Sequence, residues 1–425
     1  MFKRTIIASA VLLATSTAWA ASTGNDAFVT QYGDTNKATV NQVVSSVDNR
    51  ADIYQGGDNN FALTTQENTG SSKANTSQVG NSNSGEVLQS GNTNLSTATI
   101  DTNGSGNSAS VSQQINNGSA IATINQGAAG SDANDNMATI DQNNADKASS
   151  VINQLSNDNT ATIDNYWSDF AEATVTQQGD GGHIATVNQD ASDGANAEVT
   201  QEGRNQTATV NQNTENYGLA AAEGTSASLL QRGARNTATV DQFDQNNVAQ
   251  VTQVGEDGQY TLTQQGSADN QGNQAVGYQA GTRETAMVSQ TGNSNYAYTY
   301  QVGSGNTTDV TQNGDDNDAY AGQYGSNSSV TLTLEGDGNY AVGITSGGDN
   351  NTATVSQTGD GHIAYADAYG QGNEVTVTQT GLDNEAWAQG YGTNNAVEVT
   401  QSDSGNYAFA YSNGTGNQIL VTQGQ

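Results

Sequence analysis

The sequence predicts an all-β fold, a two-sided β-solenoid or cross-β stack of repeats about 22 residues long. Three observations predict it. A phrase close to N-x-(A/V)-x-(A/V)-x-Q recurs from residue 295 to the C-terminus at a spacing of eleven residues, with one slip to twelve. None of the 425 residues is proline, which lacks a backbone N–H and interrupts β-ladders. Only 33% of the residues are hydrophobic and 49 are glycine, so we expect no large apolar core.

Each phrase predicts one strand and one turn. Alternate side chains of a strand point to opposite faces, so Asn351, Ala353, Val355 and Gln357 share the face that we expect inside. Gly, Asp, Asn and Ser follow each phrase and suit tight turns. Phrases with β-branched or leucine centres alternate with phrases rich in alanine and aromatic residues, so the true period is two strands. About thirty-four phrases can be traced, which predicts about seventeen two-strand rungs.

The chain divides into three parts. Residues 1–20 are predicted to be a secretory signal, with Lys3 and Arg4 before an apolar stretch and small residues at the cleavage site, Ala18, Ala20 and Ala21. Residues 21–283 carry irregular repeats with loop insertions, and residues 284–425 carry regular ones. Insertions near 128–135, 214–224 and 266–272 are predicted to be surface loops, with a domain boundary as the alternative.

Charge and composition exclude several classes of function. The formal net charge is −33, which disfavours nucleic-acid binding, and residues 284–425 hold fifteen acids without a lysine or arginine. The mature chain has no apolar segment of the roughly twenty residues that a transmembrane helix needs. It also lacks cysteine, which excludes disulfides and thiol chemistry. A same-sign surface of this kind keeps chains soluble and apart until assembly.

Interior Asn and Gln side chains are expected to stack from rung to rung as hydrogen-bonded amide ladders, because unpaired buried amides are costly. A disordered Asn/Gln-rich chain is the alternative, and it would not need so regular a period. The candidate fibre-core ladder residues are Asn36, Gln42, Asn60, Gln66, Asn236, Gln242, Asn295, Gln301, Asn306, Gln312, Asn317, Gln323, Asn351, Gln357, Asn373, Gln379, Asn395, Gln401, Asn417 and Gln423.

A stricter motif, Q-x-G-x-x-N-x-A-x-x-x-Q, occurs five times without mismatch. It begins at Gln31, Gln55, Gln231, Gln290 and Gln312. This motif resembles the curlin repeat of bacterial curli fibres, and relaxed versions cover nearly all of the mature chain, which is unusually long for the family.

The resemblance implies an extracellular functional amyloid on the bacterial cell surface, serving in adhesion and biofilm matrix. Its implied partners are further copies of itself, other curli-like subunits and an outer-membrane secretion pore. Whether the chain is a major subunit, a nucleator or an adhesin stays open. The final phrase, 417–423, stops two residues before the C-terminus without a cap, which predicts head-to-tail polymerisation.

The outward faces suggest further roles. Equivalent outward positions are occupied by Tyr298, Tyr320, Tyr365, Trp387 and Phe409. This aromatic stripe is a candidate surface for lateral association of fibres or for adhesion to other surfaces. Aromatic residues also simply suit β-surfaces. Threonines line the other face, so the alternative function is a soluble secreted solenoid that binds ice or carbohydrate through its Thr or aromatic face.

Catalysis has little support in the sequence. The two histidines, His183 and His362, stand at the Asn position of the phrase, where a ladder role is more plausible than a base or metal ligand. Acidic turns lack the spacing of known Ca²⁺-binding loops. We therefore expect no enzyme activity, no cofactor and no metal.

Overall fold

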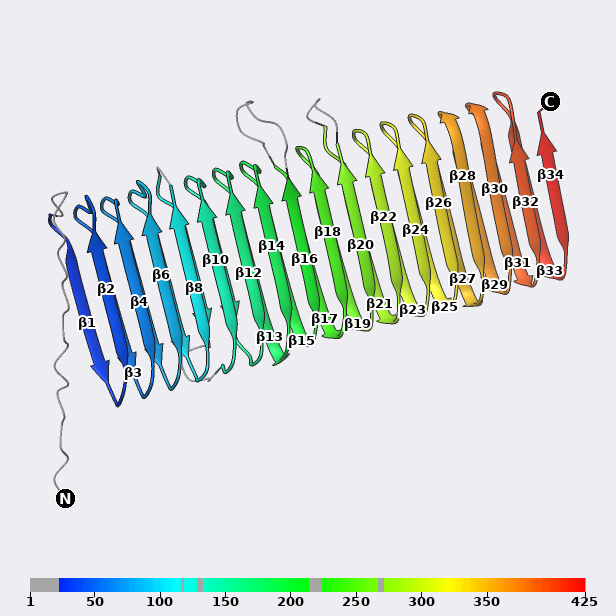
Figure 1. Ribbon diagram of the computed structural model, residues 1–425. Coiled ribbons are helices and arrows are strands. Elements are labelled where there is room, and N and C mark those ends of the chain that lie inside the picture. Colours follow the sequence, from blue (N-terminus) through cyan, green and yellow to red (C-terminus); the bar gives the residue numbers. More distant parts are fainter. Residues whose placement is uncertain (1–22, 116–117, 128–132, 214–223, 267–270, 425) are drawn as a thin grey trace, which may run out of the picture. The chain divides into compact units, whose positions relative to one another are not determined.

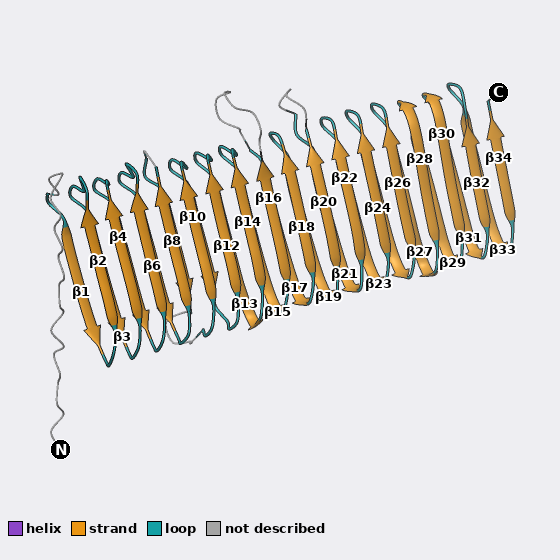
Figure 2. Ribbon diagram, viewed as in Figure 1, coloured by secondary structure: helices purple, strands orange, loops and turns teal. Residues whose placement is uncertain are grey.

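A computed structural model of the chain describes residues 23–115, 118–127, 133–213, 224–266 and 271–424. These residues form thirty-four strands joined by short turns and no helix (Figure 2). The chain divides into two compact units, Met1–Gln206 with Asn211–Ala222, and Thr207–Val210 with Glu223–Gln425. The predicted signal at 1–20 lies outside the described residues, as do the centres of the three predicted insertions.

The first unit contains two parallel sheets, one of odd-numbered and one of even-numbered strands (Figure 1). The odd strands are β1 (Asp26–Tyr32), β3 (Arg50–Gly56), β5 (Lys73–Val79), β7 (Thr97–Asn103), β9 (Ile121–Gln126), β11 (Ser149–Gln154), β13 (Glu172–Gly181) and β15 (Asn196–Arg204). The even strands are β2 (Lys37–Val43), β4 (Phe61–Glu67), β6 (Ser84–Ser90), β8 (Ser108–Gln114), β10 (Met137–Asn143), β12 (Thr160–Tyr166) and β14 (Ile184–Asp190). Strand β16 (Thr207–Asn213) holds residues of both units.

The second unit repeats this arrangement, and in Figure 1 its even-numbered arrows point opposite to its odd-numbered ones. Its odd strands are β17 (Ser226–Ala234), β19 (Val248–Glu256), β21 (Gln274–Thr282), β23 (Tyr296–Ser304), β25 (Asp318–Ser326), β27 (Tyr340–Asp349), β29 (Ile363–Gln371), β31 (Glu385–Thr393) and β33 (Tyr407–Thr415). Its even strands are β18 (Thr237–Phe243), β20 (Gln259–Gln265), β22 (Thr285–Thr291), β24 (Thr307–Asn313), β26 (Ser329–Glu335), β28 (Thr352–Asp360), β30 (Glu374–Leu382), β32 (Ala396–Gln401) and β34 (Gln418–Gln423).

Equivalent residues of alternate phrases, which lie in the same sheet, stack in register. Strand β21 pairs with β23 so that Ala275 lies beside Ala297 and Gln279 beside Gln301. We call one odd strand and the following even strand a rung. The rung spacing is 22 residues between Gln290 and Gln312 in the second unit, but 24 between Gln89 and Gln113 in the first, where the turns are longer. The predicted all-β solenoid of repeats about 22 residues long is therefore confirmed.

The expected alternation of faces is also confirmed. All four inward residues of the phrase at 351–357 are buried, and the three residues between them are only half-buried. The inward side chains of the two sheets are complementary in size, because small residues of one sheet face larger residues of the other. A Cβ added at Gly343 would lie 2.7 Å from Val330 Cγ1 and 2.9 Å from Leu332 Cδ2. The interior is thus thin and filled by short side chains.

Glycine is required at the turn of the strict motif. Gly292 has a φ of +108°, and a Cβ there would lie 2.1 Å from the carbonyl oxygen of Gly314 in the next rung. Only a residue without a side chain allows this stacking of turns. Backbone geometry therefore explains why the motif has glycine at this position, and no ligand is needed to explain it.

Candidate assembly site: amide ladders, aromatic face and strand edges

Glutamine side chains form hydrogen-bonded columns along the sheets. Gln290 Nε2 donates to Gln312 Oε1 of the next rung at 2.9 Å, and also reaches the backbone oxygens of Gln274 and Asn295, both at 3.0 Å. The same side-chain bond joins Gln379 to Gln401 at 2.8 Å. In each of these bonds the amide donates toward the higher-numbered rung, so the columns have a direction.

Asparagine columns run at the start of the strands. Asn295 Oδ1 accepts the backbone N–H of Asn317 at 3.1 Å and its Nδ2–H at 3.0 Å. The Asn317 amide then donates to the Gly336 oxygen at 2.8 Å, which ties the strand start to the neighbouring turn. The buried amides of Asn295 and Asn317 are thereby hydrogen-bonded, as burial requires.

All twenty candidate ladder residues lie at these inward positions, the asparagines just before even or odd strands and the glutamines near the strand ends. Sixteen are buried, and the four in the outermost even strands are more exposed: Asn36, Gln42, Asn417 and Gln423. Two columns are interrupted, because Gln312 stacks on Leu334 and Gln323 on Thr345. Their role in a fibre core stays a prediction.

The two histidines occupy the asparagine columns. His362 N–H donates to Asn339 Oδ1 at 3.0 Å, and His362 Nδ1 accepts the Asn384 N–H at 3.3 Å. His183 is placed in the same way, between Asn159 and Gln206. An Nδ1 that accepts is unprotonated, and burial lowers the pKa of both imidazoles. Each therefore imitates the acceptor oxygen of an asparagine.

Glu284 also stands in an asparagine column, a role that sequence reasoning missed although the phrase spacing places it there. Its side chain is 1% exposed. Oε2 accepts the Asn306 N–H at 3.1 Å and Oε1 accepts the Asn306 Nδ2–H at 3.3 Å. Burial raises the pKa of Glu284 to about 7, against the hydrogen bonds from Asn306 that lower it. The folded chain therefore favours the protonated carboxyl.

We predict that Glu284→Gln stabilises the chain at pH 8 but not at pH 4. Because the folded-state pKa is raised, the contribution of the protonated Glu284 is fully present below its unfolded pKa and is lost as pH rises through about 7. The full loss is about 3 kcal/mol, at about 1.4 kcal/mol per pKa unit. Urea unfolding of both proteins against pH measures the difference, and equal pH slopes would contradict the prediction.

The five residues of the predicted aromatic stripe lie in one column on the outer face of the odd-numbered sheet of the second unit. Tyr298 stacks on Tyr320, and Tyr365, Trp387 and Phe409 follow one another, with Val342 between the two groups. The rings of Tyr365 and Trp387 are stacked at 3.9 Å between centroids. Stacking turns their faces toward each other and leaves their edges outward.

Strand edges are open at the outermost rungs of the described chain. Among the described residues, β33 and β34 each pair with one strand, as do β1 and β2. Apolar side chains are left in solvent there: Leu420 is 69% exposed, Phe409 57% and Phe28 54%. Such edges are templates for another strand.

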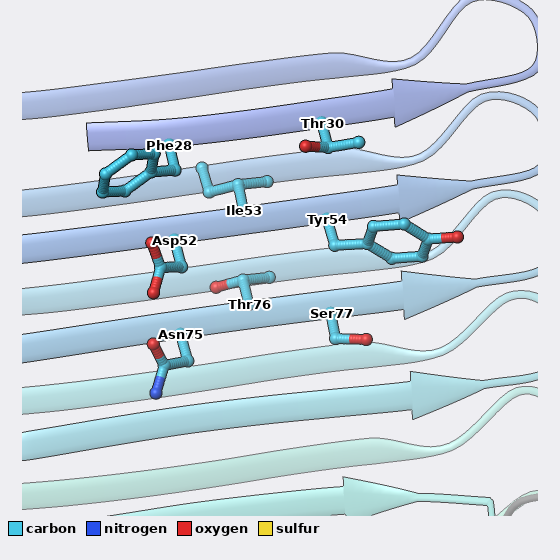
Figure 3. A pocket seen from close by; sticks show the side chains of 8 residues that line it. All are labelled: Phe28, Thr30, Asp52, Ile53, Tyr54, Asn75, Thr76 and Ser77. Atoms are coloured by element: carbon cyan, nitrogen blue, oxygen red, sulfur yellow. The ribbon is translucent and has the colours of Figure 1, made fainter.

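A shallow hollow of about 400 Å³ lies on the outer face over β1, β3 and β5 (Figure 3). Phe28 and Tyr54 flank it, and its carboxylate, Asp52, bonds Arg50 at 2.7 Å. The described part of the chain contains no group of three or more acidic, His or Cys side chains placed to hold a metal. It also contains no helix long and apolar enough to cross a membrane.

Comparison with known families identifies the repeat. The curlin associated repeat matches residues 80–114 in the first unit and residues 281–314, 306–333 and 348–381 in the second. A comparison with curated proteins finds no significant match. Each matched segment spans strands of both sheets, with the stacked phrases described above, so the chain carries curlin associated repeats in both of its units.

Proposed function

We propose that this chain is a structural subunit of an extracellular curli-like amyloid fibre that grows by adding chains head to tail. The open edges of β33 and β34 and of β1 and β2 carry this proposal. The two edges present complementary unpaired groups of the same ladder, so a second copy of the chain can pair with either edge. The family of the repeat is structural, which agrees with a role that needs no catalytic site.

The ladder direction sets which ends can join. Gln401 Nε2 donates to Gln423 Oε1 at 2.8 Å, whereas Gln423 Nε2 has, among the described residues, only the Tyr407 oxygen, at 2.9 Å. At the other edge, Gln42 Nε2 donates onward to Gln66, and no described glutamine precedes Gln42 in the column. Gln423 of one copy can therefore donate to Gln42 of the next, and two identical edges cannot satisfy each other in this way.

Extending the observed register across the joint brings like residues together. With Gln423 beside Gln42, Val421 lies beside Val40 and Asn417 beside Asn36. On the odd-numbered sheet the same step sets Phe409 beside Phe28, two exposed rings that would cover each other. The joint then repeats the interior pattern of the chain.

Basic residues gather near the β1 and β2 edge. Three of the eight basic residues that follow the predicted signal, Lys37, Arg50 and Lys73, lie in the first three odd and even strands, while no lysine or arginine follows Arg283. Both ends are nevertheless net acidic, since residues 23–79 hold six acids beside these three bases. Salt screens the repulsion between the two ends and should therefore speed their encounter.

Adhesion, biofilm formation and export through an outer-membrane pore belong to the same proposal, on the strength of the repeat family. The alternative of a soluble ice- or carbohydrate-binding solenoid is less well supported. Its threonine column, Thr331, Thr354 and Thr376, is bounded by the carboxylates Asp309 and Glu398. The stacked aromatic rings also cover one another's faces.

The purified chain from residue 21 to residue 425 tests the proposal. We expect thioflavin-T-positive fibres whose diffraction shows reflections near about 4.7 Å and about 10 Å. Seeds of preformed fibre should remove the lag. A chain that stays monomeric and rich in strand at high concentration would refute polymerisation and return attention to a soluble solenoid.

A further inference from the structure

Tyrosines of successive rungs form three contact rows on the outer face of β21 to β33. Ring centroids in the rows are separated by 5.0 to 5.7 Å. The rows are Tyr278, Tyr300 and Tyr324; Tyr296, Tyr320, Tyr340 and Tyr365; and Tyr369, Tyr391 and Tyr411. At these separations the ring edges of neighbouring phenols are in van der Waals contact.

Tyr391, at the centre of the third row, has a carboxylate partner. Its Oη donates to Asp367 Oδ2 at 2.9 Å. That hydrogen bond, together with burial, raises the pKa of Tyr391 to about 12, so the phenol stays protonated at neutral pH. Burial raises the pKa of Asp367, which makes its carboxylate a better proton acceptor. Asp367 can therefore take the phenol proton of Tyr391 directly, through this hydrogen bond.

Both neighbours of Tyr391 are open to small solutes. Tyr369 is 48% exposed and Tyr411 is 46% exposed, and each ring lies 5.5 Å from the Tyr391 ring. Gly347 makes room for the Tyr369 ring, because a Cβ at Gly347 would lie 2.8 Å from it. An oxidant can reach this row from solvent.

We infer that Tyr391 is a site of oxidative cross-linking, joined by a carbon–carbon bond to Tyr369 or Tyr411 when a peroxidase and hydrogen peroxide act on the chain. The bond would tie adjacent rungs together covalently in a protein without disulfides. Both partners lie in one chain, so the inference does not rest on fibre formation.

The chemistry balances. Each of two phenols loses one electron to the peroxidase and one proton, the proton of Tyr391 passing to Asp367. The two phenoxyl radicals couple at their ortho carbons, and the two ring hydrogens move to the oxygens to restore the aromatic rings. In sum, two tyrosines and one hydrogen peroxide give one dityrosine and two waters.

The full chain, treated with peroxidase and hydrogen peroxide at low concentration, tests this. Cleavage after glutamate separates the tyrosines into the peptides 336–374, 386–398 and 399–425. We expect a cross-link from 386–398 to 336–374 or to 399–425, two hydrogens lighter than the sum of the peptides. Tyr391→Phe should abolish both products, and Tyr369→Phe should abolish the first of them only.

Three controls make the test decisive. Tyr407→Phe alters a tyrosine of the same face whose ring belongs to none of the three rows, and it should leave both products unchanged. Asp367→Asn should lower the initial rate about a hundredfold, the lower end of the range for loss of a positioned proton acceptor. Mixed labelled and unlabelled chains should give no mixed cross-link. Equal yields in urea-unfolded chain, or cross-links that avoid Tyr391, would overturn the inference.

Discussion

Leu420→Pro is expected to slow fibre elongation by roughly tenfold to a hundredfold, while the folded chain stays intact. The carbonyl of Asn417, just before β34, accepts the Ala396 N–H at 2.8 Å, and the carbonyl of Gln423 accepts the Ser402 N–H, just after β32, at 2.9 Å. Strand geometry alternates, so the N–H of Leu420 points away from β32, toward the free edge. Proline removes that donor and places its ring in the path of the next strand. A loss of about 1–3 kcal/mol at the joint corresponds to the expected range.

The folded chain should tolerate this change because Leu420 is 69% exposed and contributes little to the core. Leu420→Ser is the matched control, since it removes the side chain but keeps the N–H, and it should elongate at a rate near that of the original chain. Elongation is measured by thioflavin T on preformed seeds, with circular dichroism of the monomer as the check on folding.

Because the proposed fibre is polar, the Leu420→Pro chain should also affect elongation by the unsubstituted chain. The Leu420→Pro chain retains an intact β1 and β2 edge, so it can add once to a growing fibre and then block the end that it has occupied. Small amounts should therefore inhibit elongation of the unsubstituted chain at one fibre end. Unchanged elongation by the Leu420→Pro chain would mean that growth does not use the edge of β34.

Much of this architecture follows from periodicity alone. A period of two within the phrase and of eleven between phrases determines which residues face inward, since only that register buries Ala and Val while pairing Asn and Gln. The same period places His183, His362 and Glu284 in the asparagine columns. What periodicity could not give was the protonation of Glu284, because that depends on burial and on the neighbouring Asn306.

The aromatic face was only partly predictable. The column of Tyr298, Tyr320 and Trp387 follows from equal positions in equal phrases. The contact between Tyr391 and Asp367 does not, because these residues stand at different positions of their phrases, and the rotamers of both side chains bring them together. Signal cleavage at Ala18, Ala20 and Ala21 stays a prediction, because it lies outside the described residues.

A buried tyrosine breaks the rule of short inward side chains, and its fit depends on one glycine. Tyr260 stacks between Ala238 and Ala286 at an alanine position, is 1% exposed, and its Oη lies 2.9 Å from Thr299 Oγ1. A Cβ added at Gly277 on the opposite sheet would lie 2.2 Å from Tyr260 Cζ. The ring therefore fills the space that a side chain at Gly277 would take.

Gly277→Ala is accordingly expected to destabilise the second unit by about 3 kcal/mol, the upper end of the range for overpacking, because a fully buried ring between stacked rungs cannot move aside. Tyr260→Ala should cost a similar amount or more, about 3–5 kcal/mol, through the cavity that it leaves. In the double variant the methyl group introduced at position 277 occupies part of that cavity, so Gly277→Ala should then cost little or even stabilise. Urea unfolding of all four monomeric chains, followed by circular dichroism, gives the coupling between the two positions. Additive losses would show that Tyr260 and Gly277 do not pack against each other, and the pairing of the two sheets at this rung would have to be redrawn.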